Sequence, residues 1–149
     1  MPTPDLELIA GAVRAAWADT PPPELIAPHR CDECQALTEA LQGRPPETIL
    51  EAVPSAVWDL PLLGDEARRY YLPGWLLPSL ADPMHDATSA LLFAFDSDHR
   101  WAPEGGYTEA QRDVIARYLE AMIDHVSEYE SPGLDRALER WAGWPSSEV

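Results

Sequence analysis

The chain has 149 residues, of which 46% are hydrophobic, and its 26 acidic and 10 basic residues give a formal net charge of −16. This length suits one domain, and the apolar content excludes a disordered chain. We predict one helical domain over residues 1–149, with a flexible tail at 145–149. The charge disfavours nucleic acid and membranes as ligands, and it favours either a basic protein partner or simple solubility.

All ten basic residues are Arg, so chemistry that requires a lysine, such as a Schiff base, is excluded. The first residues, MPTPDLELIAGAVRAAW, lack the basic leader and long apolar core of a secretory signal. We therefore expect a cytoplasmic protein, in which cysteines stay reduced.

The first half of the chain predicts amphipathic helices separated by proline-rich connections. Residues 3–19 have helical apolar spacing, with Thr3 as N-cap and Pro4 in the first turn. Prolines in 20–29 force an extended stretch. Residues 31–43 predict a second helix that ends at Gly43, with one face formed by Cys31, Cys34, Leu37, Thr38 and Leu41.

The second half predicts further helices. A short helix is expected in 44–53, and Pro73 and Pro78 should divide or kink the helical pattern in 61–83. Residues 82–95 predict a helix capped by Asp82, although 91–95 alone also suit a buried strand. Thr108 and Gln111 form a capping-box pattern ahead of a long helix. Residues 131–143 predict a last helix, with Ser131 as N-cap and Pro132 next. Inward-facing residues are expected at Met84, Ala87, Leu91, Phe95, Val114, Ile115, Tyr118, Leu119, Met122, Val126, Leu134, Ala137, Leu138 and Trp141.

The segment HRCDEC contains the only two cysteines of the chain. Its His29, Cys31 and Cys34 are three potential zinc ligands, and the fourth would come from His85, His99 or His125. The alternative is packing, in which both thiols lie on the apolar face of a helix while Asp32 and Glu33 face water. We favour packing, and therefore expect no cofactor, with zinc as the alternative.

Two catalytic interpretations are weaker. A Cys-x-x-Cys at a helix start is typical of redox pairs, but no βαβ pattern surrounds it, and the acids between the thiols should oppose thiolate formation. Asp96-x-Asp98 resembles the nucleophile segment of the haloacid dehalogenase phosphotransferases, yet Arg100 replaces the hydroxyl residue expected there and no lysine exists. No Gly-x-Ser-x-Gly motif occurs. Trp101 and Trp144 lie in expected loops and could mark a contact surface.

Three segments in order, PPPELIAPHRCDECQAL, LPLLGDEARRYYLPGWLL and TEAQRDVIARYLEAM, resemble a family of small bacterial proteins of uncharacterised function. The match runs from about Pro21 to Met122. The resemblance implies a mostly helical domain and brings no known activity. The shared positions are His29, Cys31, Cys34, Tyr70, Tyr71, Leu72, Pro73 and Gln111.

Together these patterns predict an all-α, single-domain bundle of five or more helices. The predicted function is that of a small acidic, non-enzymatic protein-binding domain, such as an immunity or regulatory protein for a basic partner. The alternative is a zinc-supported domain built on HRCDEC, including an enzyme of a type that the known motifs do not cover. The sequence does not define an oligomeric state.

Overall fold

A computed structural model describes residues 5–97, 101, 103 and 105–142. All secondary structure in this part of the chain is helical, so the all-α prediction is confirmed and the strand alternative for 91–95 is wrong. The α-helices are α1 (Leu6–Trp17), α2 (Asp32–Leu41), α3 (Ile49–Ala52), α4 (Asp65–Tyr71), α5 (Pro73–Ala81), α6 (Asp86–Ser97), α7 (Glu109–Ala121) and α8 (Ser131–Trp141). The 3₁₀ helices are η1 (Pro46–Thr48), η2 (Pro54–Trp58), η3 (Leu60–Leu62) and η4 (Met122–Asp124).

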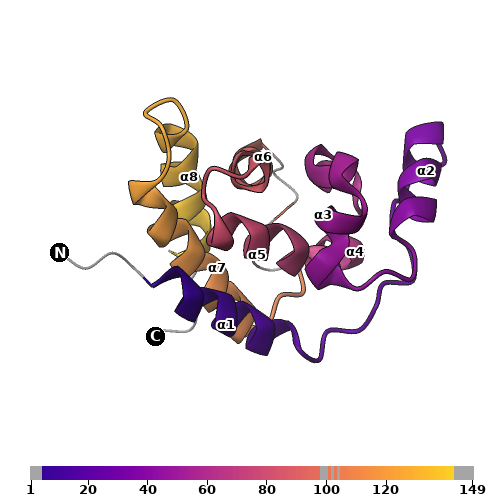
Figure 1. The fold of residues 1–149 in the computed structure, drawn as a ribbon, viewed down its shortest axis with the longest axis horizontal. Coiled ribbons are helices and arrows are strands. Elements are labelled where there is room, and N and C mark those ends of the chain that lie inside the picture. Colours follow the sequence, from indigo (N-terminus) through magenta and orange to yellow (C-terminus); the bar gives the residue numbers. More distant parts are fainter. Residues whose placement is uncertain (1–4, 98–100, 102, 104, 143–149) are drawn as a thin grey trace.

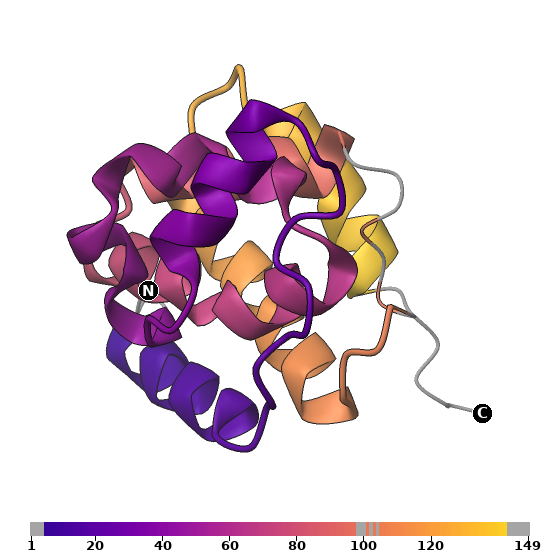
Figure 2. The same cartoon turned by 90° about the vertical axis from the view of Figure 1, so that its right-hand side faces the viewer.

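Five helices pack in closed order around the core: α1 on α5, α5 on α6, α6 on α8, α8 on α7, and α7 back on α1 (Figure 1). The α5 helix is apolar around most of its circumference, and both Trp75 and Leu76 are fully buried. A short helix that is hydrophobic all round must lie inside the fold. The α2 helix lies at the edge of the molecule, after an extended proline-rich segment (Figures 1 and 2).

Prolines set several helix boundaries as expected. The α4 helix ends at Tyr71 and α5 begins at Pro73, because proline accepts the first position of a helix but lacks the N–H needed to continue one. Pro78 lies inside α5, which continues to Ala81, so Pro78 does not divide the helical pattern as Pro73 does. Gly43 has a φ of 78° after α2, the left-handed conformation predicted for the helix end.

Three predicted N-caps are wrong. Asp5 caps α1 by accepting hydrogen bonds from the N–H groups of Glu7 and Leu8, and the expected Thr3 and Pro4 lie outside the described residues. Glu130, not the expected Ser131, is the N-cap of α8.

The third error is at α6. Asp82 closes a turn by accepting from the N–H of Met84, and His85 Nδ1 then accepts from the N–H of Ala87 at the helix start. The helix begins at Asp86, three residues later than a helix capped by Asp82 would, so Met84 is exposed instead of buried. Aspartate favours both turns and caps, and sequence alone does not separate the two roles.

Most of the predicted inward positions are buried. Val126 and Leu138 are the partly buried ones, and they pack on the edge of the core. Trp101 is also buried, with its ring stacked on that of Phe95 at 4.0 Å between centroids, so its predicted place on a contact surface is wrong. Trp144, His99 and the predicted tail at 145–149 lie outside the described residues.

Candidate functional site

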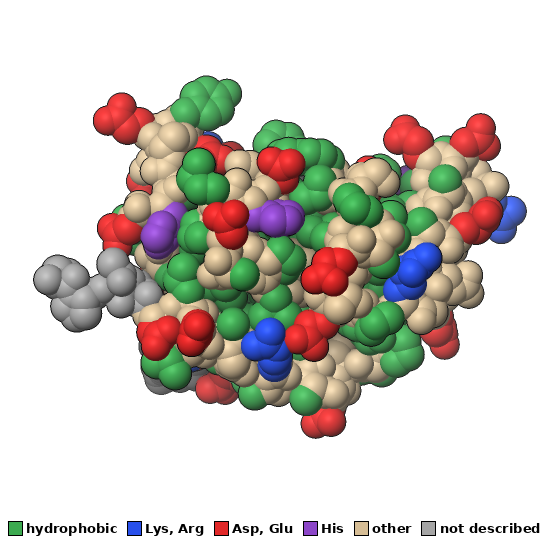
Figure 3. All heavy atoms as spheres, viewed as in Figure 1, with side chains coloured by type: hydrophobic (Ala, Val, Ile, Leu, Met, Phe, Trp, Pro, Cys, Tyr) green, Lys and Arg blue, Asp and Glu red, His purple; other side chains and the backbone are tan. Residues whose placement is uncertain are grey.

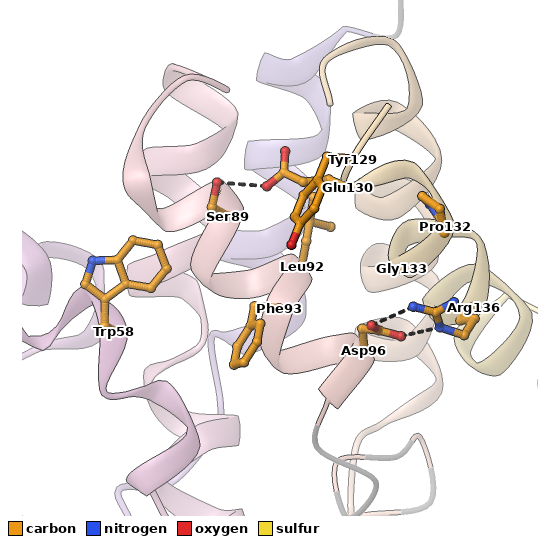
Figure 4. Close-up of a pocket in the computed structure, with 10 residues that line it drawn as sticks. All are labelled: Trp58, Ser89, Leu92, Phe93, Asp96, Tyr129, Glu130, Pro132, Gly133 and Arg136. Atoms are coloured by element: carbon orange, nitrogen blue, oxygen red, sulfur yellow. Dashed lines mark hydrogen bonds and ion pairs between the residues drawn. The ribbon is translucent and has the colours of Figure 1, made fainter. Parts of the chain in front are cut away.

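A groove crosses the outer face of α6 and encloses a cavity of about 410 Å³ (Figure 4). Its floor comes from α6, one side from the end of η2, and the other from α8 and the loop before it. The lining residues are Trp58, Ser89, Leu92, Phe93, Asp96, Tyr129, Glu130, Pro132, Gly133 and Arg136.

Three aromatic side chains of this groove are exposed: Trp58 by 54%, Phe93 by 62% and Tyr129 by 94%. Moving a large aromatic side chain out of water lowers the free energy of the system. A set of exposed aromatic side chains around one groove is therefore typical of a contact surface. Figure 4 shows Trp58 and Tyr129 on opposite sides of Phe93. We call these three residues, with Asp96 and Glu130, the aromatic groove.

Two carboxylates of the aromatic groove are held in place. Arg136 donates to both oxygens of Asp96, at 2.6 and 2.9 Å, which fixes the orientation of that carboxylate. Ser89 Oγ donates to Glu130 Oε2 at 2.9 Å. A fixed carboxylate beside an aromatic face suits a cation, because both groups attract positive charge.

Gly133 explains how α8 approaches α6 closely at this groove. A Cβ added at Gly133 would lie 3.2 Å from Asp96 Oδ2, closer than most Cβ contacts in proteins. Glycine at this position therefore lets the Asp96 side chain lie against the first turn of α8.

Asp96 lies near the end of helix α6, not at the edge of a strand. Its bidentate contact with Arg136 is that of a structural ion pair. Asp98, the second acid of the phosphotransferase pattern, lies outside the described residues. The structure therefore gives Asp96 a surrounding unlike that of an aspartyl nucleophile.

The packing prediction for HRCDEC is right for Cys34 and wrong for Cys31. Cys34 is 1% exposed and lies on the same buried face as Leu37 and Leu41, while Asp32 and Glu33 face water as expected. Cys31 is exposed, because it is the N-cap of α2 and its extended backbone turns its side chain out of the helical register.

Zinc binding by His29, Cys31 and Cys34 stays a prediction. Among the described residues, no group of three or more His, Cys, Asp or Glu side chains has an arrangement that would hold a metal ion. His85 and His125 are exposed, and His85 already caps α6 through Nδ1.

Two residues of the resembling segments bond to the chain on either side of residues 21–37. Tyr71 Oη donates to the carbonyl of Leu41 at 2.8 Å, which joins α4 to the end of α2. Gln111 Nε2 donates to Thr20 Oγ1 at 3.0 Å, at the start of the proline-rich segment. These contacts give two of the shared residues a role in holding the segment that carries α2.

No protein-family model, curated protein or solved structure matches this chain. Within the described residues, no helix is both long and apolar enough to cross a membrane.

No local sequence pattern indicates the aromatic groove. Phe93 follows two buried leucines in an apolar run, so hydrophobicity alone places it in the core. Helical periodicity does indicate its exposure: when Leu91 and Phe95 face inward on a helix, Phe93, midway between them, faces outward.

Proposed function

We propose that this chain is a non-enzymatic protein-binding domain that binds a basic partner through the aromatic groove. The observation that carries this proposal is the set of three exposed aromatic side chains around one groove that also contains two fixed carboxylates. An immunity or regulatory protein for a basic partner would use such a surface.

Charge selects the partner class. Two acids and one arginine line the groove, inside a chain whose formal net charge is −16. Figure 3 shows carboxylates spread over one whole face, with few arginines among them. The surrounding negative field attracts a basic protein and speeds its approach, whereas it repels a second copy of this chain.

The groove would provide short-range contacts after this attraction. An arginine guanidinium can stack on the exposed ring of Tyr129 while its N–H groups donate to Glu130, which lies beside that ring (Figure 4). Aromatic anchors of this kind commonly supply most of the affinity at protein interfaces. We therefore expect the partner to present at least one arginine at the centre of its contact surface.

Calorimetric titration of the full chain with an arginine-rich peptide tests this function. We expect saturable binding that weakens as salt is raised, and no binding of a glutamate-rich peptide. Replacing Tyr129 and Trp58 by Ser should lower the affinity at least ~10-fold, the usual effect of losing an aromatic anchor. Leu8→Ser is the control, because Leu8 is 66% exposed on α1, outside the groove.

Two results would contradict the proposal. One is equal loss of affinity in the groove variant and in Leu8→Ser. The other is equal binding of the acidic and the basic peptides.

A further inference from the structure

The two thiols of the chain differ sharply in their access to solvent. Cys31 is exposed at the N-cap of α2, with φ of −68° and ψ of 164°. Cys34 lies in the first turn of the same ten-residue helix and is 1% exposed. One thiol can therefore meet a reagent from solution, and the other cannot without a change in structure.

The spacing allows the two sulfurs to bond to each other. Cys31 is the N-cap of α2 and Cys34 is the third residue of that helix, the two positions whose side chains and backbones meet in a capping box, and the two thiols interact. No other cysteine occurs in the chain, so an intramolecular disulfide can only join Cys31 to Cys34.

The local electrostatics favour ionisation of the exposed thiol. Interaction with the backbone N–H and the thiol of Cys34 lowers the pKa of Cys31, although the contact falls short of a full hydrogen-bonded cap. The same thiol pair and burial raise the pKa of Cys34. Glu33 does oppose ionisation of Cys31, as the sequence suggested, but this effect is smaller than the opposing interactions with Cys34.

We propose that Cys31 and Cys34 form a redox-active dithiol that small-molecule disulfides oxidise, with Cys31 as the attacking thiol and Cys34 as the resolving one. This inference is independent of the aromatic groove.

The reaction has two thiol–disulfide exchanges. The Cys31 thiolate attacks one sulfur of the small disulfide, whose S–S bond breaks and releases one thiolate, leaving a mixed disulfide on Cys31. Cys34 then loses its proton and attacks the Cys31 sulfur, which releases the second small thiolate. The protein pair loses two electrons and two protons, and the two released thiols carry them.

Intact-mass spectrometry of the full chain with oxidised glutathione tests the proposal. We expect the wild-type chain to lose two hydrogens and retain no adduct. Cys34→Ser should accumulate one glutathione adduct, because the resolving thiol is gone. Cys31→Ser should react at least ~10-fold more slowly, since Cys34 is shielded. In denaturant, Cys31→Ser should react readily, which would show that burial causes the slow reaction.

Three outcomes would overturn the proposal. The first is equal reactivity of the two single variants while circular dichroism shows both folded. The second is a wild-type chain that keeps a stable glutathione adduct. The third is near-stoichiometric zinc, in protein purified without chelator or metal resin, that leaves both thiols unreactive.

Discussion

The side-chain amide of Gln111 donates to the carbonyl of Ala16 at 3.2 Å and joins the start of α7 to the end of α1. The same side chain accepts from the N–H of Thr108 through Oε1 and completes the capping box. Gln111 is 2% exposed, so no water replaces these partners readily. One residue therefore caps a helix and fixes its packing on another.

Replacing Gln111 by Ala should lower the free energy of unfolding by about 2 kcal/mol, because the partly buried carbonyl of Ala16 and the cap of α7 both lose a partner. Thr108→Ala removes only the cap and should cost about 1 kcal/mol. Urea unfolding measures both values. An equal loss of unfolding free energy in the two variants would show that the contact between Gln111 and α1 adds no stability.

Gly74 allows α5 to pass close to the segment that contains η1 and α3. A Cβ at Gly74 would overlap both Ile49 Cγ2 and the carbonyl oxygen of Pro46. We expect Gly74→Ala to cost about 2–3 kcal/mol through overpacking.

Gly11→Ala is the matched control, because Gly11 is exposed in α1 and an added Cβ meets nothing within 4 Å. It should raise stability by about 0.5–1 kcal/mol, since alanine favours the helix. Thermal unfolding should show a lower Tm for Gly74→Ala and a higher Tm for Gly11→Ala than for the wild-type chain. Shifts of the same sign would contradict the close approach at Gly74.

Two buried tyrosines predict loss of stability in alkali. Burial raises the pKa of both Tyr107 and Tyr118 above the ordinary value of 10.0. Their hydroxyls are hydrogen-bonded, Tyr107 to Trp101 Nε1 at 2.7 Å and Tyr118 to Ser79 Oγ at 2.7 Å.

The unfolded chain ionises these tyrosines above about pH 10, whereas the folded chain keeps them neutral to higher pH. The contribution of these tyrosines to the free energy of unfolding is therefore complete below about pH 10 and is lost as the pH rises further. Urea unfolding from pH 8 to 11 should show this fall, and Tyr118→Phe should make it shallower. An unchanged slope in Tyr118→Phe would contradict the role of Tyr118.

The charge of the aromatic groove should set its affinity for basic peptides. Arg136→Gln removes a positive charge from the groove lining and should tighten binding of an arginine-rich peptide about 2–5-fold at low salt. Asp96→Asn changes the charge in the opposite direction and should weaken binding. Calorimetric titration measures the affinity of both variants for the peptide. If both variants bind more tightly, or both more weakly, than the wild-type chain, the charge of the groove does not determine its affinity for basic peptides.

Regular, strongly periodic parts of this fold could be predicted from sequence. The α7 helix follows its capping box and apolar spacing, and α5 follows its prolines. Each signal is local, because a cap or a proline acts on the backbone within one turn.

The parts that sequence did not reveal depend on contacts between distant segments. Trp101 follows a helix in a polar stretch, but its ring packs on Phe95 and Trp141, which lies forty residues further along the chain. The aromatic groove combines η2, α6 and α8, and no local pattern brings Trp58 and Tyr129 to one surface. Helical spacing places Cys31 on the buried face, but a change of one residue in the helix start makes it the N-cap of α2 and moves its side chain into water.

The proposed function requires that the aromatic groove bind a basic partner. Fluorine NMR of the full chain labelled with 5-fluorotryptophan tests it most directly, because Trp58 is 54% exposed while Trp17, Trp75, Trp101 and Trp141 are buried. Trp58→Phe assigns the resonance. On addition of an arginine-rich peptide, the account predicts a saturable shift of the Trp58 resonance that Tyr129→Ser reduces. Binding of that peptide with an unmoved Trp58 resonance would contradict the account.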